Sequence, residues 1–213
     1  YRLLEHHGNI NDTKFIKEIM SNPESLMEII DKTYLSSDEN ERSAEIEQVK
    51  NDNSYALLGW HIFYTLRQTP FVDSNSTIDE VALNNYIDQL QTLGNAKHKI
   101  KDVNTVIGEL LGNYPETEDY PPVPICDIIE RLNNKEVNDG FRTRLYNKRG
   151  ITVRPAYDGG TLEKNEANKY KKYADKIRYT HPIVCSIFDD LSSDYNRMAK
   201  TEDTKAKIEK MEF

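Results

Sequence analysis

Apolar residues along this chain recur mostly three or four positions apart, and hardly any stretch alternates apolar with polar residues. The first spacing puts apolar side chains on one face of an α-helix, whereas alternation is typical of a half-buried strand. Glycines and prolines, which interrupt helices, number only nine and eight in 213 residues. The pattern therefore predicts an all-α fold of about nine helices, arranged as an irregular multi-helix bundle or a short solenoid-like stack.

Capping signals place the first helices. Asp12 precedes an apolar segment around Ile16 and is the expected N-cap of the first helix. The run Asn22-Pro23-Glu24 offers the second helix a cap, a proline at its first position and an acidic first turn. Residues 35–53 are mostly charged, which predicts either a solvated helix or a mobile connector, and we favour a helix from about Asp38 onward.

The densest apolar stretch, residues 54–66, contains no Asp, Glu, Lys or Arg. A helix that is apolar on nearly every side is typical of a protein core, so we expect this one to be the central helix. The substitution Trp60→Ala is then expected to cost roughly 3 to 5 kcal/mol. The predicted core draws on the whole chain: Leu57, Leu58, Trp60, Phe63, Leu83, Ile87, Leu90, Ile107, Leu111, Ile128, Ile129, Phe141, Ile177, Ile187, Leu191 and Tyr195.

Turn and break signals divide the rest of the chain. Thr77 and Glu80 form a capping box before a helix that is expected to end at Gly94-Asn95. Residues 114–124 contain four prolines, and no regular element spans such a segment. We therefore expect an N-terminal helical part (1–113), a proline-rich crossing (114–124) and a C-terminal helical part (125–213) that fold as one cooperative unit.

Within the C-terminal part, one helix is expected to open at Pro124 and the next to end at Gly150. Because Gly150 follows the basic residues Lys148-Arg149, it is predicted to adopt a left-handed conformation. Thr161 then starts a long amphipathic helix, and His181-Pro182 separates it from the last one.

Composition and charge exclude several classes of protein. With 37% hydrophobic and 30% charged residues the chain is expected to fold, and it has no apolar run long enough to cross a membrane. Two cysteines, Cys126 and Cys185, without a Cys/His cluster, predict neither a disulfide scaffold nor a structural zinc site. These features indicate a cytoplasmic protein. A start at Tyr1 rather than Met suggests a piece of something longer.

Motifs for chemistry are missing from the sequence. No HExxH or EF-hand pattern predicts a metal site, and no GxSxG or phosphate-binding loop is present. His61 lies in an apolar stretch and is interpreted as a hydrogen-bonded core histidine. The sequence therefore predicts no catalytic residue, no metal and no cofactor.

The one unusual segment runs from residue 142 to residue 178. It contains eleven Lys and Arg against four Asp and Glu, in a chain with a net charge of -8. Such an asymmetry indicates an anionic ligand, and a helix that starts at glycines offers free N–H groups to the same ligand. The candidate ligand-binding residues are Arg142, Arg144, Arg149, Arg154, Gly159, Gly160 and Thr161.

A purely structural interpretation of the same residues is favoured over ligand binding. In it the arginines pair with carboxylates or carbonyls of the same chain and fix an irregular loop. Arg149 or Arg154 is then expected to be partly buried against such a partner, and Arg154→Ala to cost roughly 1 to 3 kcal/mol.

The order of residues in this region resembles a known group of proteins. It reads Tyr146-Asn147-Lys148-Arg149-Gly150-Ile151, Arg154, Asp158-Gly159-Gly160 and Glu163, followed by a Tyr/Ala-rich helix and the His181-Pro182 break. The pattern is similar to the C-terminal helical region of large uncharacterised bacterial multidomain proteins, over about residues 12 to 205. Leu162 stands where that group has Gln, and Ile183 where it has Arg after the proline. The resemblance implies a helical part of a larger protein and no particular activity.

Together these observations predict a non-catalytic helical interaction or scaffold module of a larger bacterial protein. Its partner is expected to be a protein, either another domain of the parent chain or a separate subunit. The alternative is a site for a small phosphate-bearing molecule or nucleic acid on the basic segment. The net charge of -8 repels a polyanion, so a small anion is the better version. An enzyme that moves a proton with Asp158 or Glu163 is the third interpretation.

Overall fold

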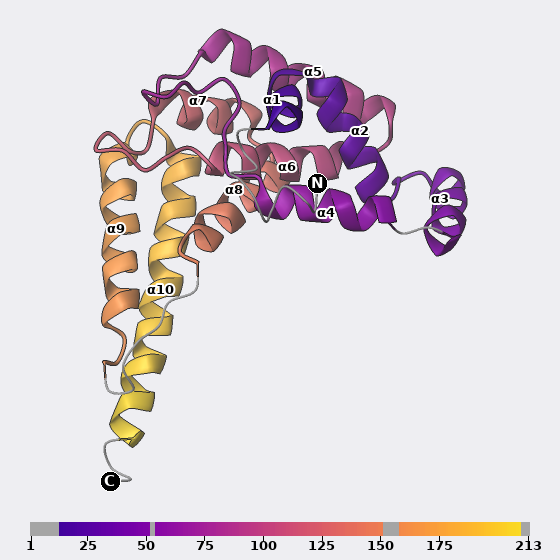
Figure 1. Ribbon diagram of the computed structural model, residues 1–213. Helices are drawn as coiled ribbons and strands as arrows, with labels where there is room; N and C mark the ends of the chain where they lie inside the picture. The colour runs from indigo at the N-terminus through magenta and orange to yellow at the C-terminus, as the bar shows by residue number, and fades with distance from the viewer. Residues whose placement is uncertain (1–12, 52–53, 151–157, 210–213) are drawn as a thin grey trace.

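The computed structural model describes residues 13–51, 54–150 and 158–209, and it confirms the all-α fold (Figure 1). Ten helices lie in these ranges: α1 (Lys14–Ser21), α2 (Pro23–Thr33), α3 (Glu39–Asn51), α4 (Ser54–Thr65), α5 (Glu80–Ala96), α6 (Ile100–Gly112), α7 (Val123–Leu132), α8 (Lys135–Lys148), α9 (Thr161–Ile177) and α10 (Pro182–Glu209). The β pairing found in the same ranges is one isolated bridge between Val72 and Ile78.

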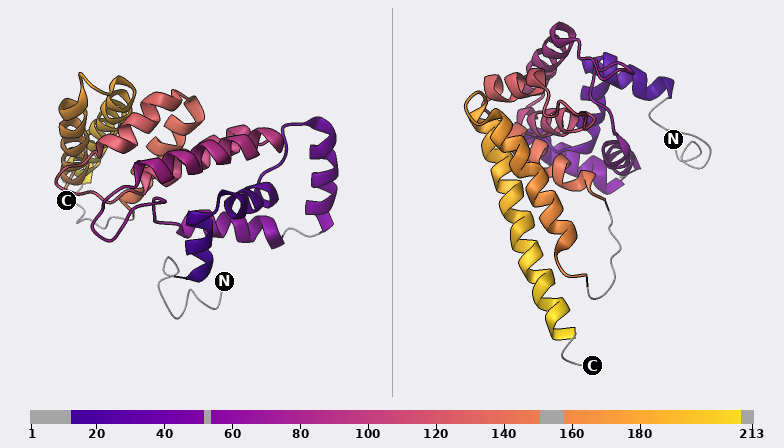
Figure 2. Two further views of the ribbon diagram at one scale, coloured as in Figure 1. Left: turned by 90° about the horizontal axis from the view of Figure 1, so that it is seen from above. Right: turned by 90° about the vertical axis from the view of Figure 1, so that its left-hand side faces the viewer.

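The helices form an irregular bundle with two extensions. α1, α2 and α4 to α8 make up the body, and α9 and α10 form a hairpin that projects from it (Figure 1). α3 lies at the opposite edge, as Figure 2 shows from two further sides. α10 has 28 residues and α9 has 17, so α10 extends beyond α9 at the far end of the hairpin (Figure 1).

In the body, the backbones of α6 and α8 come into close contact. A Cβ atom added to Gly108 on α6 would lie 2.1 Å from the carbonyl oxygen of Val137 on α8. A Cβ added to Gly140 on α8 would lie 2.2 Å from the carbonyl oxygen of Thr105 on α6. Each helix thus presses its backbone against a glycine of the other. α6 precedes the proline-rich segment 114–124 and α8 follows it, so this contact joins the two sides of that segment. The division of the chain at 114–124 stays a prediction.

Aromatic side chains attach the hairpin to the body. The rings of Tyr170 on α9 and Tyr195 on α10 stack in parallel, with centroids 5.8 Å apart, and Tyr146 of α8 stacks on Tyr195 at 5.6 Å. The hydroxyl of Tyr170 donates to the carbonyl of Leu145 at 3.0 Å. At the start of α10, the Glu130 carboxylate accepts from the first free backbone N–H groups and so caps this helix.

The prediction that residues 54–66 form the central core helix is wrong. α4 buries only one face, with Gly59, Ile62 and Phe63, against the body. Leu57, Leu58 and Trp60, all assigned to the core from the sequence, are exposed. The cause is position, because α4 lies at the edge of the bundle, where neighbouring helices cover one side (Figure 1). The other predicted core residues are buried as expected: Phe63, Leu83, Ile87, Leu90, Ile107, Leu111, Ile128, Ile129, Phe141, Ile177, Ile187, Leu191 and Tyr195.

Three predicted helix starts differ by one or two residues from those observed. α7 begins at Val123 rather than at Pro124. Thr13 caps α1, and its hydroxyl accepts from the N–H of Ile16; Asp12 lies outside the described residues. Asp79, not Thr77, caps α5, because its carboxylate accepts from the N–H of Ala82. The N–H of Thr77 instead donates to a carboxylate in the preceding turn. The cap predicted at Asn22 is confirmed.

One buried lysine connects α3 to the body. The ammonium of Lys99, which precedes α6, donates to the carbonyls of Asp31 and Tyr34 at 2.6 and 2.8 Å. It also pairs with the carboxylate of Glu45 on α3 at 2.8 Å and with that of Asp31 at 2.9 Å. Hydrogen bonding of this kind satisfies a charge that would otherwise be costly to bury. Residues 39–51 are thus helical, close to the start at Asp38 that the sequence favours. Lys99 holds this end of α3 together with Ser36, whose N–H and hydroxyl donate to the carboxylates of Glu45 and Glu41.

Candidate functional site

The predicted ligand-binding arginines within the described ranges do not meet at one point. Arg142 pairs with Asp194 of α10. Arg144 is buried and donates to the side chain of Asn113 and to the carbonyl of Leu66. Burial, together with the neighbouring Arg67, lowers the pKa of Arg144 to about 10. The two arginines therefore bind two different groups of the chain itself.

Arg149 forms a buried ion pair within the chain. Its guanidinium lies 2.6 Å from the carboxylate of Glu163 on α9 and over the ring of Tyr195. Burial by itself lowers the pKa of Arg149, but the hydrogen bond to Glu163 and the negative charge of that carboxylate and its neighbours together outweigh burial, so the pKa is raised. Gly150 follows with φ of 65°. Both the left-handed Gly150 and the partial burial of Arg149 against a carboxylate are confirmed.

The helix start at Gly160 already has an anionic partner. The N–H of Gly160 donates to the carboxylate of Asp203 on α10 at 2.9 Å, and Lys164 pairs with the same carboxylate at 2.7 Å. These two contacts lower the pKa of Asp203. Gly159 adopts φ of 59°, and the hydroxyl of Thr161 donates to the carbonyl of Asp158. A carboxylate of the chain thus stands where the sequence predicts a ligand anion, while Arg154 lies outside the described residues.

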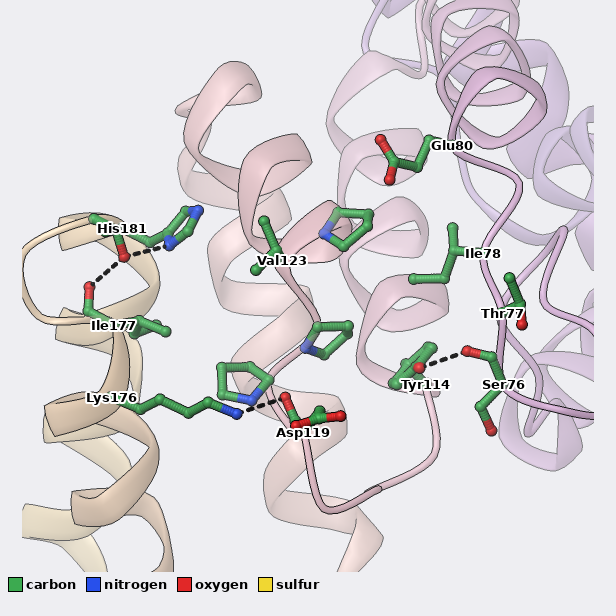
Figure 3. Close-up of a pocket in the computed structure, with 14 residues that line it drawn as sticks. Ser76, Thr77, Ile78, Glu80, Tyr114, Asp119, Val123, Lys176, Ile177 and His181 are labelled. Atoms are coloured by element: carbon green, nitrogen blue, oxygen red, sulfur yellow. Dashed lines mark hydrogen bonds between the residues drawn. The ribbon is translucent and has the colours of Figure 1, made fainter.

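A groove that the sequence did not reveal lies between three parts of the chain (Figure 3). It has a volume of about 560 Å³. The loop before α5 forms one wall, and the end of α9 with the following turn forms the other. Prolines at the start of α7 lie between them. The lining residues are Ser76, Thr77, Ile78, Glu80, Tyr114, Asp119, Pro121, Pro122, Val123, Pro124, Lys176, Ile177, Thr180 and His181.

Hydrogen bonds fix the walls of this groove. The Tyr114 hydroxyl donates to the carbonyl of Ser76 at 2.7 Å, and the Lys176 ammonium donates to the carbonyl of Asp119 at 2.8 Å (Figure 3). The imidazole of His181 lies 3.0 Å from the carboxylate of Asp127 and 2.9 Å from the hydroxyl of Thr180. The Thr180 hydroxyl also lies within hydrogen-bond distance of the carbonyl of Ile177, in the last turn of α9. Together these contacts connect the turn between α9 and α10 to α7.

The exposed side of α4 is a second surface that the sequence analysis missed. Leu57, Trp60 and Tyr64 expose 59, 56 and 73% of their area, and their i, i+3, i+7 spacing places them on one face. The Trp60 ring packs on Tyr34, with centroids 5.4 Å apart. The apolar pattern of residues 54–66 is the sequence feature that reports this surface, although the pattern alone predicts that the helix is buried. His61, expected in the core, is half-buried.

Chemistry based on a metal or a reactive thiol finds no support in the described ranges. No group of three or more His, Cys, Asp and Glu side chains there could hold a metal ion. Cys126 and Cys185 are buried free thiols, and burial raises the pKa of Cys126 to about 12, which disfavours the nucleophilic thiolate. No helix in these ranges is both long and apolar enough to cross a membrane.

Comparison with protein-family models, with curated proteins and with solved structures finds no match for this chain. The resemblance to the C-terminal regions of large bacterial proteins therefore stays a prediction. What the chain does has to be inferred from its own surfaces.

Proposed function

We propose that this chain is a non-catalytic helical module that binds a partner protein through the exposed face of α4. The partner is either a separate protein or another domain of a larger bacterial protein of which this chain is a part. Leu57, Trp60 and Tyr64 are the contact residues, and they enter an apolar groove of the partner.

The single observation that supports this proposal is that both the buried and the exposed face of α4 are apolar, whereas neighbouring helices cover only the buried one. No residue of the helix is charged. Exposed apolar side chains that cluster on one surface mark interaction sites, and tryptophan and tyrosine dominate the binding energy of protein interfaces. Apolar residues at i, i+3 and i+7 are the anchors that helices insert into grooves of other proteins. Trp60 is held against Tyr34, so less side-chain freedom is lost on binding.

The basic segment does not carry a second proposal. Arg142, Arg144 and Arg149 contact groups of the chain itself, and Gly160 donates to Asp203. A ligand anion would have to displace these partners.

The proposal is tested with Trp60 as a reporter, because it is the one tryptophan of the chain. Proteins retained from a lysate of the source by the immobilised chain are purified and titrated against it. Binding should shift the fluorescence of Trp60 to shorter wavelength as the ring leaves water. Leu57→Ser and Tyr64→Ser should each weaken binding by at least about 10-fold, equivalent to about 1.4 kcal/mol.

The matched control is Ile208→Ser, which removes an exposed apolar residue near the end of α10. It should bind like the parent chain. The proposal is wrong if the two α4 variants bind as tightly as the parent, or if Trp60 emission does not change on binding.

A further inference from the structure

The groove of Figure 3 has an apolar interior that the fold does not fill. Ile78 on one wall, Val123 in the middle and Ile177 on the other wall face it together with three prolines (Figure 3). Its volume of about 560 Å³ lies within the range of pockets that hold small ligands or side chains.

Exposed apolar residues also stand next to the groove. Val123 exposes 57% of its area, Val81 73% and Tyr179 96%. Val81 directly follows the lining residue Glu80, and Tyr179 directly precedes Thr180. Of these three residues Val123 lines the groove itself, and exposed apolar side chains at a concave surface are typical of an interaction site.

The charges of the groove define what it accepts. The carboxylates of Glu80 and Asp119 line it, and no Lys, Arg or His of the described ranges lies within ion-pair distance of either. The lining cation Lys176 donates to the carbonyls of Asp119 and Tyr120, and His181 faces Asp127. Two carboxylates thus remain for a positively charged ligand.

The prolines further limit the mode of binding. Pro121, Pro122 and Pro124 have no N–H group, so at these positions the middle of the groove offers an incoming backbone no donor of the kind that a sheet edge has. The side chains of a ligand therefore supply the main contacts, an apolar one in the groove and a cationic one at the carboxylates.

We infer that this groove binds an extended basic segment of a partner protein, with an aromatic side chain between Ile78, Val123 and Ile177 and a flanking Lys or Arg at Glu80 and Asp119. This site is separate from the α4 face and does not depend on it. The carboxylates of Glu80 and Asp119 disfavour an acidic or phosphate-bearing segment.

The test uses the full chain with labelled isoleucine and valine methyl groups and three probes of equal length. The probes are acetyl-Ala-Lys-Phe-Lys-Ala-amide, its Glu-Phe-Glu analogue and its Lys-Ala-Lys analogue. The first should shift the methyl signals of Ile78, Val123 and Ile177 in a saturable manner. The second and third should bind at least about 10-fold more weakly, and added salt should weaken the first.

Substitutions then locate the charge recognition. Glu80→Gln and Asp119→Asn should each weaken the first peptide several-fold, and Val123→Lys should abolish its binding. Glu39→Gln on α3 removes an exposed carboxylate elsewhere and should have no effect. Val123 is largely exposed, so its substitution leaves the fold intact, which the circular dichroism spectrum checks.

Three outcomes overturn the inference. One is the absence of any shift at the three methyl groups at millimolar peptide. Another is equal binding of the basic and acidic peptides. The third is a shift confined to the methyl groups of Ile62, the isoleucine of α4, which would assign peptide binding to α4 instead.

Discussion

α8 and α4 show that hydrophobicity does not by itself decide which helix is buried. Six of the fourteen residues of α8 are charged, yet it lies in the middle of the molecule and buries Val137, Gly140, Phe141, Arg144 and Leu145. α4 has no charged residue and leaves Leu57, Trp60 and Tyr64 in solvent.

The difference lies in what each helix meets. α8 crosses α6 where Gly108 and Gly140 let the two backbones touch, so even a polar helix gains close contacts. Its one buried charge, Arg144, is bonded to Asn113 and Leu66. α4 has a glycine contact too, at Gly59 against Thr33, but only on one side. The burial of a helix is thus set by the helices that pack against it. An apolar face that no helix of the chain covers, such as that of α4, is available to the partner we propose.

The largest effect is expected at the crossing of α6 and α8. In Gly108→Ala the new methyl group meets the backbone of α8, which cannot rotate away, so the helices must separate. We expect a loss of at least about 3 kcal/mol in the free energy of unfolding, measured with urea. Gly150→Ala is the control, because nothing lies within 4 Å of the added Cβ. Its expected loss in the free energy of unfolding is about 1 to 2 kcal/mol, the cost of a left-handed backbone for alanine. A smaller loss for Gly108→Ala than for this control would contradict the close crossing.

A slightly smaller effect is expected where α3 joins the body. Lys99→Met keeps the length of the side chain but leaves the carboxylate of Glu45 and two carbonyls without their cation. The expected loss in the free energy of unfolding is about 2 to 3 kcal/mol, because those buried acceptors are only partly hydrated once the ammonium is gone. Hydrogen exchange should quicken in α3 and stay unchanged in α8. Equal quickening in both helices would mean that Lys99 supports the whole fold rather than one edge.

The two faces of α4 are compared directly by two truncations. Trp60→Ala should cost about 1 kcal/mol or less, because the ring is more than half exposed. Phe63→Ala, three residues on and buried, is the matched comparison and should cost about 3 to 5 kcal/mol. Urea unfolding followed by circular dichroism measures both. Similar losses in the free energy of unfolding for the two variants would contradict the exposure of Trp60.

The smallest effect concerns the hairpin, which exposed ion pairs support. Hydrogen bonds from Arg178 and Lys171 lower the pKa of Asp189 to about 2. Because the pKa is lower in the folded chain, this contribution is complete above about pH 4 and disappears as the pH falls towards 2. The side chain is partly exposed, so the contribution is well below about 1 kcal/mol. The difference in unfolding midpoint between the parent and Asp189→Asn should shrink from pH 5 to pH 2.5, and a constant difference would refute this assignment.

Several features of the fold were accessible from the sequence because they depend on neighbouring residues. Helix periodicity, the cap at Asn22 and the left-handed Gly150 follow from local geometry and were predicted correctly. The caps at Thr13 and Asp79 were missed by one or two positions, since several nearby residues compete for the same role. The ion pair of Arg149 was expected, but its partner Glu163 was not identified as such.

By itself the sequence determined which segments are helical and that the arginines of the basic segment need carboxylates or carbonyls. Only the tertiary structure decided which ones they bind, because Asp194 and Asp203 are far from Arg142 and Gly160 along the chain and close to them only in the folded molecule. It also decided that α4 lies at an edge and that residues from three separate segments enclose one groove. Periodicity reports which faces of a helix are apolar, whereas burial depends on which other helices arrive there.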